Sequence, residues 1–370
     1  MLRFAFAVPC LCLLFAGLTA CSPKPPIEIG FLGGLSGKFS DLGTATRNGA
    51  LLAVELVNLS GGVDGRKLHL LELDDKQSVE SALQAMEEFQ KQGVVAVVGP
   101  STSSIAVAVT PVADRQRLLL VAPTATTNKL SAKDDYFLRS IGDASFYGRS
   151  AAQWHYQRQG VRSVALILDM ANADYTESWG EPYAAEFKRL GGTVIGMERF
   201  TSTTNPDHRA IAQKLLEGKP EMLVTVASSV DSALIAQRAR TLQPQVRLAG
   251  AGWASTERLI ELGGVGVEGM LFEQYFDRFD QSPKFLGFLK AYRERFKSEP
   301  GFGALLAFDA ANMIVAGLKK SEDHQGLKAQ VLAIGKFEGA QNSLTVDKFG
   351  DVTRGVYFGV VKNGTFAKPD

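Results

Sequence analysis

Residues 94–104 carry the sequence VVAVVGPSTSS, which predicts a strand, a tight turn and the start of a helix. The run of valine and alanine is typical of a strand buried on both faces of a parallel sheet. Gly99 and Pro100 break this run, and four hydroxyl residues then precede an apolar segment at 105–112. Ser and Thr favour helix N-termini, where free N–H groups and the helix dipole also attract anions such as a carboxylate. Either an ordinary helix cap or half of a ligand site would explain this stretch.

A second hydroxyl run follows the next strand along the chain. The expected strand Leu118–Val121 ends near Pro123, and residues 124–127 read TATT. Ligands of doubly wound sheets bind at the carboxyl ends of the strands. The turns at 101–104 and 124–127 therefore predict one pocket, in which hydroxyl and N–H groups converge on a small anionic or polar group.

Strands and helices alternate along most of the chain, and this order predicts an α/β fold. One series of alternating elements precedes Ile141 and a second follows it, so we expect two doubly wound lobes with parallel sheets. The last third differs, because a strand at 269–276 leads into two long helices at 283–296 and 302–319. Short alternating runs then end the chain, with Asn363-Gly364 as a hairpin turn.

The composition is that of a globular protein with no bias toward nucleic acid. Of the 370 residues, 45% are hydrophobic and 21% are charged, and 40 Lys and Arg stand against 39 Asp and Glu. This balance leaves no basic excess for a nucleic-acid partner. The 4 histidines are scattered without ligand spacing, and of the 3 cysteines only Cys21 would remain in a processed chain. We expect no internal disulfide and no metal site.

The first residues resemble the leader of an exported lipoprotein. Arg3 precedes an apolar run at 4–15, which is too short to span a bilayer but suits a secretory signal. The sequence LTAC at 18–21 is similar to the lipobox of bacterial lipoproteins, whose cysteine is acylated and becomes the new N-terminus. We expect a signal peptide at 1–20, a lipid anchor on Cys21 and a tether at 21–26. The protein would then lie in the periplasm or on the cell surface, attached to a bacterial membrane. A plain secretory signal before a cysteine is the alternative.

The sequence lacks motifs for catalysis or cofactor binding. Residues 264–269 match GxGxxG, but they precede a strand instead of opening a helix after one, so a dinucleotide site is rejected. The chain has no phosphate-binding P-loop, no nucleophile elbow and no zinc-protease motif. We expect neither an enzyme nor a cofactor.

Several short segments, taken in their order and spacing, carry a family resemblance. They are IGFLGGLSG at 29–37, NLSGGVDGRKL at 58–68, LDD at 73–75, VVGPSTSS at 97–104, VAPTAT at 121–126, DY at 174–175, AQRAR at 236–240 and AFDA at 307–310. In these segments the chain resembles the type I periplasmic binding proteins of the branched-chain amino acid (leucine/isoleucine/valine) class, which serve ABC importers. The resemblance covers essentially the whole chain after the leader.

The resemblance implies two lobes that are joined by three hinge crossings and close on a ligand between them. We place the crossings near Ile141, Asp277 and Asp347. Lobe 1 would then comprise residues 27–142 and 278–346, and lobe 2 would comprise residues 143–277 and 347–370.

The resemblance also implies which residues bind the ligand. Ser103 and Thr126 match the family's carboxylate-binding hydroxyls, and Ser101 and Thr124 match neighbouring contacts. Tyr175 matches an aromatic residue that covers the ligand, although packing of its ring on the hinge would explain it equally well. The other candidates, from the two turns and the second lobe, are Thr102, Ala125, Ser228 and Trp253.

Three positions depart from the family pattern. The family holds the ligand's ammonium group with a tyrosine and an acidic residue, and the matching positions here are Ser228 and Gly252. Leu42 stands where the family has an aromatic residue in the cleft. Because a buried ammonium needs a carboxylate or a ring of acceptors, we expect a small carboxylate or amide whose second half is apolar or weakly polar. Asp231 or Asp169 would replace the acidic residue if either faces the cleft.

The resemblance predicts a lipid-anchored solute-binding component of an ABC importer. Its partners would be a small-molecule ligand (an amino acid, organic acid or amide) and the permease subunits of the importer. A ligand sensor of the same fold, docking on a membrane signalling receptor, is the alternative, and neighbouring genes for permeases or for a kinase would distinguish the two. An enzyme on this scaffold would need a nucleophile–base pair, which the sequence does not provide.

Overall fold

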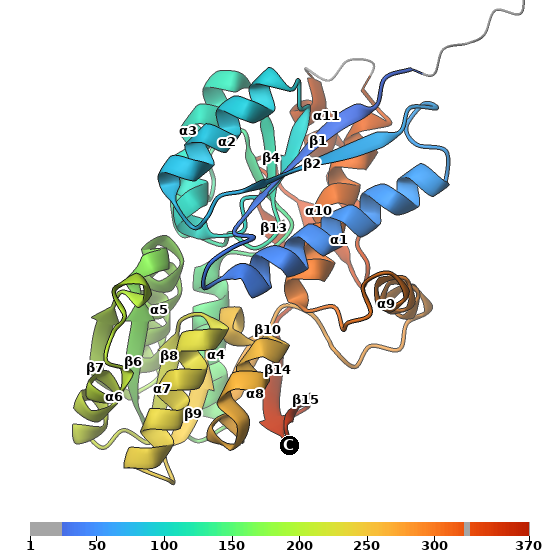
Figure 1. Ribbon diagram of the computed structural model, residues 1–370. Coiled ribbons are helices and arrows are strands. Elements are labelled where there is room, and N and C mark those ends of the chain that lie inside the picture. The colour runs from blue at the N-terminus through green and yellow to red at the C-terminus, as the bar shows by residue number, and fades with distance from the viewer. Residues whose placement is uncertain (1–23, 322–325, 370) are drawn as a thin grey trace, which may run out of the picture.

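The computed structural model describes residues 24–321 and 326–369, which form two α/β lobes (Figure 1). The first part of the chain builds the upper lobe in this view, and the middle part builds the lower lobe. Helices from the last third return to the upper lobe, and the final strands join the lower one. The expected signal peptide at 1–20 and the anchor at Cys21 lie outside the described residues. Within the described ranges, no helix combines the length and apolar character that a membrane crossing requires.

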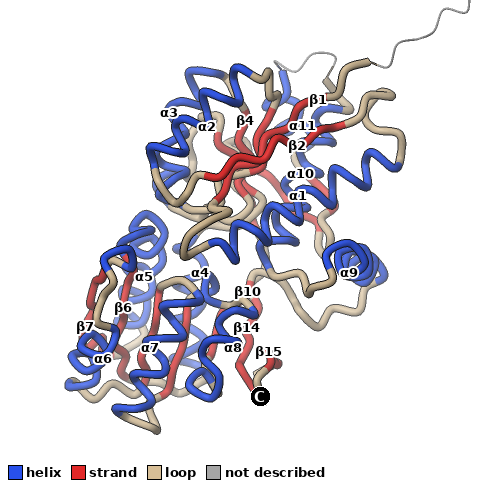
Figure 2. The backbone as a smooth tube through the Cα atoms, in the orientation of Figure 1, coloured by secondary structure: helices blue, strands red, loops and turns tan. Residues whose placement is uncertain are grey.

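The first lobe is built on a five-stranded parallel sheet. In spatial order its strands are β2 (Leu68–Asp74), β1 (Ile27–Gly33), β3 (Ala96–Val98), β4 (Leu119–Ala122) and β5 (Phe137–Arg139). One face is covered by α2 (Val79–Lys91) and α3 (Ser103–Gln116), and the other by α1 (Ser40–Leu59), α10 (Phe302–Leu318) and α11 (Leu327–Ile334), as Figure 2 shows.

The strands of this sheet are continuously apolar because both of their faces are buried. Ile29 and Phe31 pack toward α1 and α10, whereas Leu32 packs toward α2 and α3. In β3, Val98 packs on the same face as Ile29 and Phe31, and Val97 packs on the same face as Leu32. The buried strand predicted from the valine run is therefore confirmed.

The second lobe contains a seven-stranded sheet. In spatial order its strands are β15 (Thr365–Ala367), β14 (Tyr357–Lys362), β10 (Leu271–Gln274), β9 (Arg247–Gly250), β8 (Met222–Val226), β6 (Ser163–Asp169) and β7 (Thr193–Phe200). β14 and β15 form an antiparallel edge, joined by the predicted Asn363-Gly364 turn, and the other five strands run parallel. The doubly wound α/β architecture of both lobes is confirmed.

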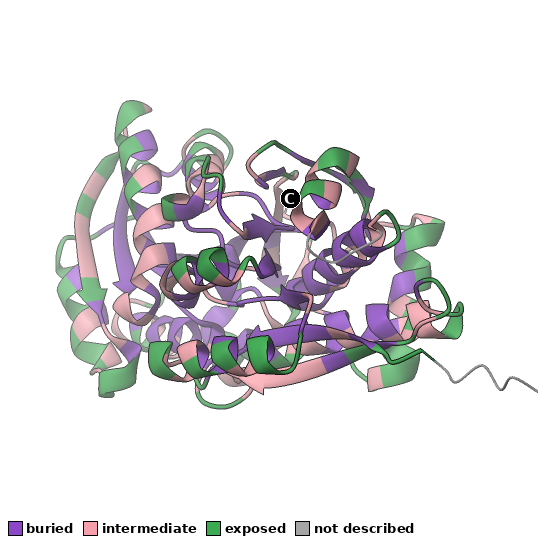
Figure 3. Cartoon of the chain, turned by 90° about the horizontal axis from the view of Figure 1, so that it is seen from above, coloured by how far each residue is buried: buried purple, intermediate pink, exposed green. Residues whose placement is uncertain are grey.

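Helices cover both faces of the second sheet. They are α4 (Ala144–Gln157) and α5 (Ala173–Arg189) on one face and α6 (His208–Glu217), α7 (Ser229–Leu242) and α8 (Glu257–Gly263) on the other. Figure 3 shows buried strands in the interior and exposed residues on the outer sides of the helices. The loops that face the other lobe follow the carboxyl ends of the parallel strands.

The chain passes between the lobes three times, after β5, after β10 and after a third sheet. After the second crossing come α9 (Pro283–Phe296) and the helices of the first lobe. The third sheet is small and antiparallel, with strands β11 (Lys336–Glu338), β12 (Ser343–Val346) and β13 (Val352–Thr353). Because β13 pairs with β12, the third crossing follows Thr353, a few residues beyond the position expected near Asp347. The polar turn at 347–351 connects two strands of this sheet instead of two lobes.

An ion pair fixes the third crossing to the first lobe. Arg354 pairs through Nη2 with the Asp309 carboxylate on α10, and both side chains are buried. The Nε of Arg354 donates to the carbonyl oxygen of Ser140, in the first crossing, at 2.5 Å. Asp309 also accepts a hydrogen bond of 2.6 Å from the N–H of Ala340. The first and third crossings are therefore held side by side.

Candidate functional site

A small cavity lies between the two lobes, where the carboxyl ends of both parallel sheets meet. Leu42, Ser101, Thr124 and Phe302 line it from the first lobe, and Asn172, Tyr175, Trp253 and Tyr275 line it from the second. Its empty space is about 250 Å³. Because residues of both lobes enclose it, a ligand would enter when the lobes separate.

Polar contacts hold the lobes together around this cavity. The Nζ of Lys38, just before α1, lies 2.6 Å from the Oδ1 of Asp231, in the first turn of α7. The Oδ2 of Asp41 accepts hydrogen bonds from the hydroxyls of Ser229 and Thr256 at 2.7 and 3.0 Å. Each of these contacts joins an element of the first lobe to one of the second, so the structure is a closed form.

The two hydroxyl turns meet, as their positions after β3 and β4 predict. The Oγ of Ser103 accepts hydrogen bonds from the N–H groups of Thr126 and Thr127, at 3.1 and 3.2 Å. The hydroxyl of Thr124 donates to the carbonyl oxygen of Ser101 at 2.5 Å. Ser101 and Thr124 line the cavity. The turns therefore form one rigid wall, held by the hydroxyls themselves.

Four of the residues predicted in these turns do not line the cavity. The Oγ of Ser103 faces the other turn, and Thr102 precedes α3 as its N-cap residue without a side-chain cap bond. Ala125 is buried in the apolar core beside α2 and α3. Thr126 is 1% exposed, and its Oγ1 has no hydrogen-bond partner among the described residues.

Aromatic rings form the opposite wall. Tyr175, near the start of α5, contacts Trp253 edge to face with ring centroids 5.6 Å apart, and Trp253 contacts Phe39 of the first lobe at 5.1 Å. Tyr275, which follows β10, packs against Phe302 at 5.0 Å. The phenol oxygens of Tyr175 and Tyr275 lie 3.5 Å apart. This wall offers a large apolar surface with two neutral hydroxyls.

Tyr275 occupies the space beside Gly252. A Cβ atom added to Gly252 would lie 2.6 Å from the Cζ and 2.8 Å from the hydroxyl oxygen of Tyr275, which is far too close. Gly252 opens the short 3-10 helix at Gly252–Ala254 that follows β9 and carries Trp253. The glycine is therefore required for the present position of the Tyr275 ring.

One carboxyl group is buried behind the aromatic wall. The Oε1 of Glu273, on β10, accepts hydrogen bonds from the Trp179 indole at 2.8 Å and from the N–H of Gly252 at 2.6 Å. Its Oε2 has no partner among the described residues. Burial raises the pKa of Glu273 to about 8, although the hydrogen bond from Gly252 opposes this shift. Glu273 is therefore protonated and neutral at pH 7.

The remaining predicted polar groups of the second lobe lie away from the cavity. Ser228 caps α7 by accepting from the N–H of Asp231 at 3.2 Å and donates to its Oδ2 at 2.8 Å. Burial alone would raise the pKa of Asp231, but hydrogen bonds from His208, Lys38 and Ser228 hold it below its usual value. Asp169 accepts from the N–H groups of Ala171 and Ser202, both at 3.0 Å. Neither aspartate faces the cavity, so neither replaces an acidic residue there.

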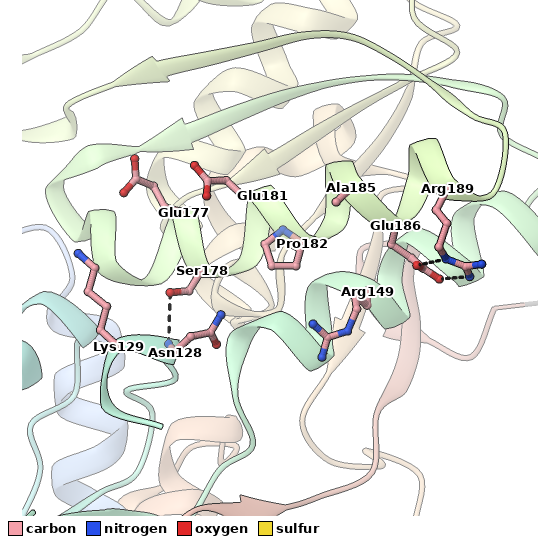
Figure 4. Close-up of a pocket in the computed structure, with 10 residues that line it drawn as sticks. All are labelled: Asn128, Lys129, Arg149, Glu177, Ser178, Glu181, Pro182, Ala185, Glu186 and Arg189. Atoms are coloured by element: carbon pink, nitrogen blue, oxygen red, sulfur yellow. Dashed lines mark hydrogen bonds and ion pairs between the residues drawn. The ribbon is translucent and has the colours of Figure 1, made fainter. Parts of the chain in front are cut away.

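A larger groove, with about 1060 Å³ of empty space, lies on the outer surface where α4 and α5 meet the loop at 128–129 (Figure 4). Its contacts across the lobes include the N–H of Asn128, which donates to the Ser178 hydroxyl at 3.3 Å, and Lys129, which pairs with Asp174 at 2.6 Å. Within the groove, Glu186 pairs with Arg189 at 2.7 Å. Among the described residues, this groove contains none of either hydroxyl turn and no aromatic ring, so we assign the ligand site to the inter-lobe cavity.

Comparison with known proteins identifies the family. The model of the periplasmic binding protein family matches residues 26–365. The chain belongs to this family. The predicted family and the two-lobed fold are therefore confirmed, and the chain is a solute-binding protein of the type I class.

Relatives of this periplasmic binding protein include the leucine-, isoleucine-, valine-, threonine-, and alanine-binding protein of Pseudomonas aeruginosa. The two are 24% identical over 88% of this chain and 87% of the relative. A branched-chain amino acid transporter substrate-binding protein of Streptococcus pneumoniae, solved with isoleucine, is 25% identical, with a TM-score of 0.84 over 92% of this chain and 97% of that one. An ABC transporter solute-binding protein of R. palustris, solved with benzoate, shares the fold at 17% identity, with a TM-score of 0.83 over 92% and 95%.

In this periplasmic binding protein, three residues of the cavity escaped prediction: Asn172, Tyr275 and Phe302. Asn172 and Tyr275 follow the carboxyl ends of β6 and β10, where ligands of such sheets bind, so strand ends offered a general signal for both. Phe302 opens α10, and nothing in its local sequence separates it from core aromatic residues. Of the predicted residues, the cavity brings together Ser101, Thr124, Tyr175 and Trp253.

Proposed function

We propose that this periplasmic binding protein captures a small carboxylate-bearing molecule, an amino acid or a related acid or amide, between its lobes and delivers it to the permease subunits of an ABC importer. The observation that carries the proposal is the pairing of two hydroxyl turns with an aromatic wall across one closed cavity. Ser101 and Thr124 supply the polar side, and Tyr175 and Trp253 supply the apolar side. The names of the relatives, which are amino acid-binding and transporter substrate-binding proteins, support the importer.

The polar side suits an anion for two physical reasons. The 14-residue helix α3 begins at Ser103, so its free N–H groups and the positive end of its dipole lie beside the turn that contains Ser101. A carboxylate in the cavity would also receive hydrogen bonds from the Ser101 and Thr124 hydroxyls if these turn toward it from their present partners, the Thr46 hydroxyl at 3.0 Å and the Ser101 carbonyl at 2.5 Å. Ser103, Thr126, Thr102 and Ala125 would then act by shaping the turns, with the unpartnered hydroxyl of Thr126 as a reserve donor.

Ligand binding would use the closure already visible between the lobes. The pairs Lys38–Asp231 and Asp41–Ser229 form only when the lobes meet, so they stabilise the closed state that holds the ligand. A permease that recognises surfaces of both lobes would thereby distinguish the closed form from the open one. We also propose that the protein is exported and held at a bacterial membrane by a lipid on Cys21.

A thermal-shift screen of the purified protein against amino acids, organic acids and amides tests the ligand class. A ligand that selects the closed form raises the melting temperature by mass action. The best ligand is then titrated calorimetrically into Ser101→Ala and Thr124→Val, each of which we expect to weaken binding about 10- to 100-fold by loss of one hydrogen bond to a charged group.

Thr204→Val is the matched control, because the Thr204 hydroxyl also donates to a backbone carbonyl, that of Thr201 at 2.8 Å, but it is exposed and remote from the cavity. Unchanged affinity in both cavity variants, or a screen in which no carboxylate raises the melting temperature, would show that the hydroxyl turns do not hold a carboxylate.

A further inference from the structure

We propose that the ligand of this cavity is a small apolar carboxylic acid without an ammonium group, and that the corresponding amino acid is excluded. The inference rests on the proposed function, which places the carboxylate at the hydroxyl turns, and it narrows the ligand class through the groups that surround the rest of the molecule. The observations that support it concern Tyr275, Gly252 and Glu273.

The cavity offers no negative charge to an ammonium group. Among the described residues that line it, none bears a carboxylate. Its neutral acceptors are also engaged: the Oδ1 of Asn172 accepts the N–H of Ser104 at 3.1 Å, and the phenols of Tyr175 and Tyr275 face each other at 3.5 Å. Burying an ammonium without an anionic partner is strongly unfavourable, because its lost hydration is not replaced.

The nearby aspartates cannot supply the missing charge. Asp231 is already neutralised by Lys38 at 2.6 Å and faces His208 at 2.8 Å. The Oδ2 of Asp41 is occupied by the hydroxyls of Ser229 and Thr256. Both carboxylates take part in closing the lobes, so turning either toward a ligand would break the contacts that trap it.

Glu273 is the remaining acid near the wall, and it is not among the residues that line the cavity. Its Oε1 is held by the Trp179 indole and by the N–H of Gly252. Full burial also favours its neutral form, since its pKa is raised to about 8. It therefore acts as a neutral support of the wall.

Gly252 and Tyr275 together explain why the wall is neutral at this point. The side chain of any other residue at 252 would meet the Tyr275 phenol at less than van der Waals distance, so the phenol takes the place in which a longer polar side chain would stand. With Trp253, Tyr175 and Phe302 beside it, this surface fits a flat or branched apolar group.

Matched ligand pairs test the inference on the wild-type protein. Isocaproate is leucine without its ammonium group, and phenylacetate is phenylglycine without its ammonium group. We expect one of these acids to raise the melting temperature and bind in calorimetry, and its amino acid to bind at least about 100-fold more weakly. Phenylacetamide and isocaproamide serve as controls for the carboxylate.

The outcomes separate this inference from the proposed function. An amino acid that binds as tightly as its deaminated partner overturns the inference and leaves the carboxylate site intact. Amides that bind as tightly as the acids overturn the carboxylate assignment but support exclusion of the ammonium. No binding by any acid or amino acid of the two pairs overturns both.

A pair of double variants provides the converse test. Gly252→Glu with Tyr275→Ala removes the phenol and places a carboxylate at this position, whereas Gly252→Gln with Tyr275→Ala places a neutral side chain of the same size there. We expect leucine to bind the first variant at least about tenfold more tightly than the second. Equal leucine affinity in two folded variants would overturn the inference, and if either fails to fold, the wild-type ligand pairs decide.

Discussion

The Nζ of Lys38 lies 2.6 Å from the Oδ1 of Asp231 and thereby joins the first lobe to the second beside the cavity. Asp231 is fully buried and also contacts the Nε2 of His208 at 2.8 Å. Asp231 keeps His208 and Ser228 as partners when the lobes separate, so opening removes only its contact with Lys38 and does not leave an unpaired buried charge. The Lys38–Asp231 pair therefore favours the closed form.

Lys38→Met should therefore weaken ligand binding by favouring the open form. The variant keeps the apolar stem of the lysine and removes only the charged contact. We expect a loss of about fivefold in affinity, corresponding to about 1 kcal/mol, measured by calorimetry with the best acid of the screen. Small-angle scattering of the ligand-free protein should show a larger radius of gyration. Lys214→Met is the control, since Lys214 pairs with Glu198 at 2.8 Å within one lobe. Identical behaviour of the two variants would rule out a role of Lys38 in closure.

Gly252→Ala should destabilise the protein, because its methyl group would lie 2.6 Å from the Tyr275 ring. We expect a loss of about 1–3 kcal/mol in the free energy of unfolding, with reduced ligand binding as the ring shifts. Tyr275→Leu should lower the free energy of unfolding by less in the Gly252→Ala protein than in the wild type. We expect the two losses to differ by about 1 kcal/mol in urea unfolding. Gly287→Ala is the matched control, since a Cβ there meets nothing within 4 Å. Strict additivity of the two cavity substitutions would contradict the contact.

Ser103→Ala should destabilise the first lobe by separating the hydroxyl turns. The N–H groups of Thr126 and Thr127 lose their acceptor in a buried place, which costs about 1–3 kcal/mol in the free energy of unfolding. Ser60→Ala removes a hydroxyl that donates to the Leu56 carbonyl at an exposed site, and it should change stability by less than about 0.5 kcal/mol. Equal effects of the two substitutions would mean that Ser103 does not hold the turns together.

The polar half of the site could be predicted from the sequence because its signals are local. A buried strand, a proline turn and a hydroxyl run mark the end of β3, and the same pattern recurs after β4. Ser101 and Thr124 line the cavity for this reason. The hydrogen-bond partner of the Ser103 hydroxyl could not be predicted from the sequence. Whether this hydroxyl contacts a ligand or the N–H of Thr126 depends on how the two turns pack.

The aromatic half of the site could not be predicted from the sequence, because it forms only where the two lobes pack together. Tyr275 follows the strand β10, and Phe302 is the first residue of the helix α10. At either place an aromatic ring packs into a hydrophobic core as readily as it lines a cavity. Only the packing of the two lobes against each other places these two rings 5.0 Å apart at the inter-lobe wall. The third crossing lies a few residues beyond its expected position for a related reason, because the turn after Val346 joins two strands whose pairing the local sequence does not signal.

Glu273→Gln should alter the pH dependence of stability. Because burial raises the pKa of Glu273 to about 8, the folded protein keeps a proton that the unfolded chain loses above its ordinary pKa of about 4.3. This contribution to stability is complete below about pH 4 and is lost as the pH rises to about 8, with a slope of up to about 1.4 kcal/mol per pH unit. Glutamine has no proton to lose, so the stability of wild type relative to the variant should fall from about pH 5 to about pH 8 in urea unfolding.

Glu186→Gln provides the control for this slope. The hydrogen bond from Arg189 lowers the pKa of Glu186 to about 2, so this group is ionised in both the folded and unfolded states over most of the same pH range. Its curve should run parallel to that of the wild type between about pH 6 and about pH 8, whatever the difference in absolute stability. Parallel curves for Glu273→Gln as well would mean that Glu273 is ionised in the folded protein. A negative charge would then stand behind the Tyr275 wall, and the exclusion of ammonium ligands would lose one of its supports.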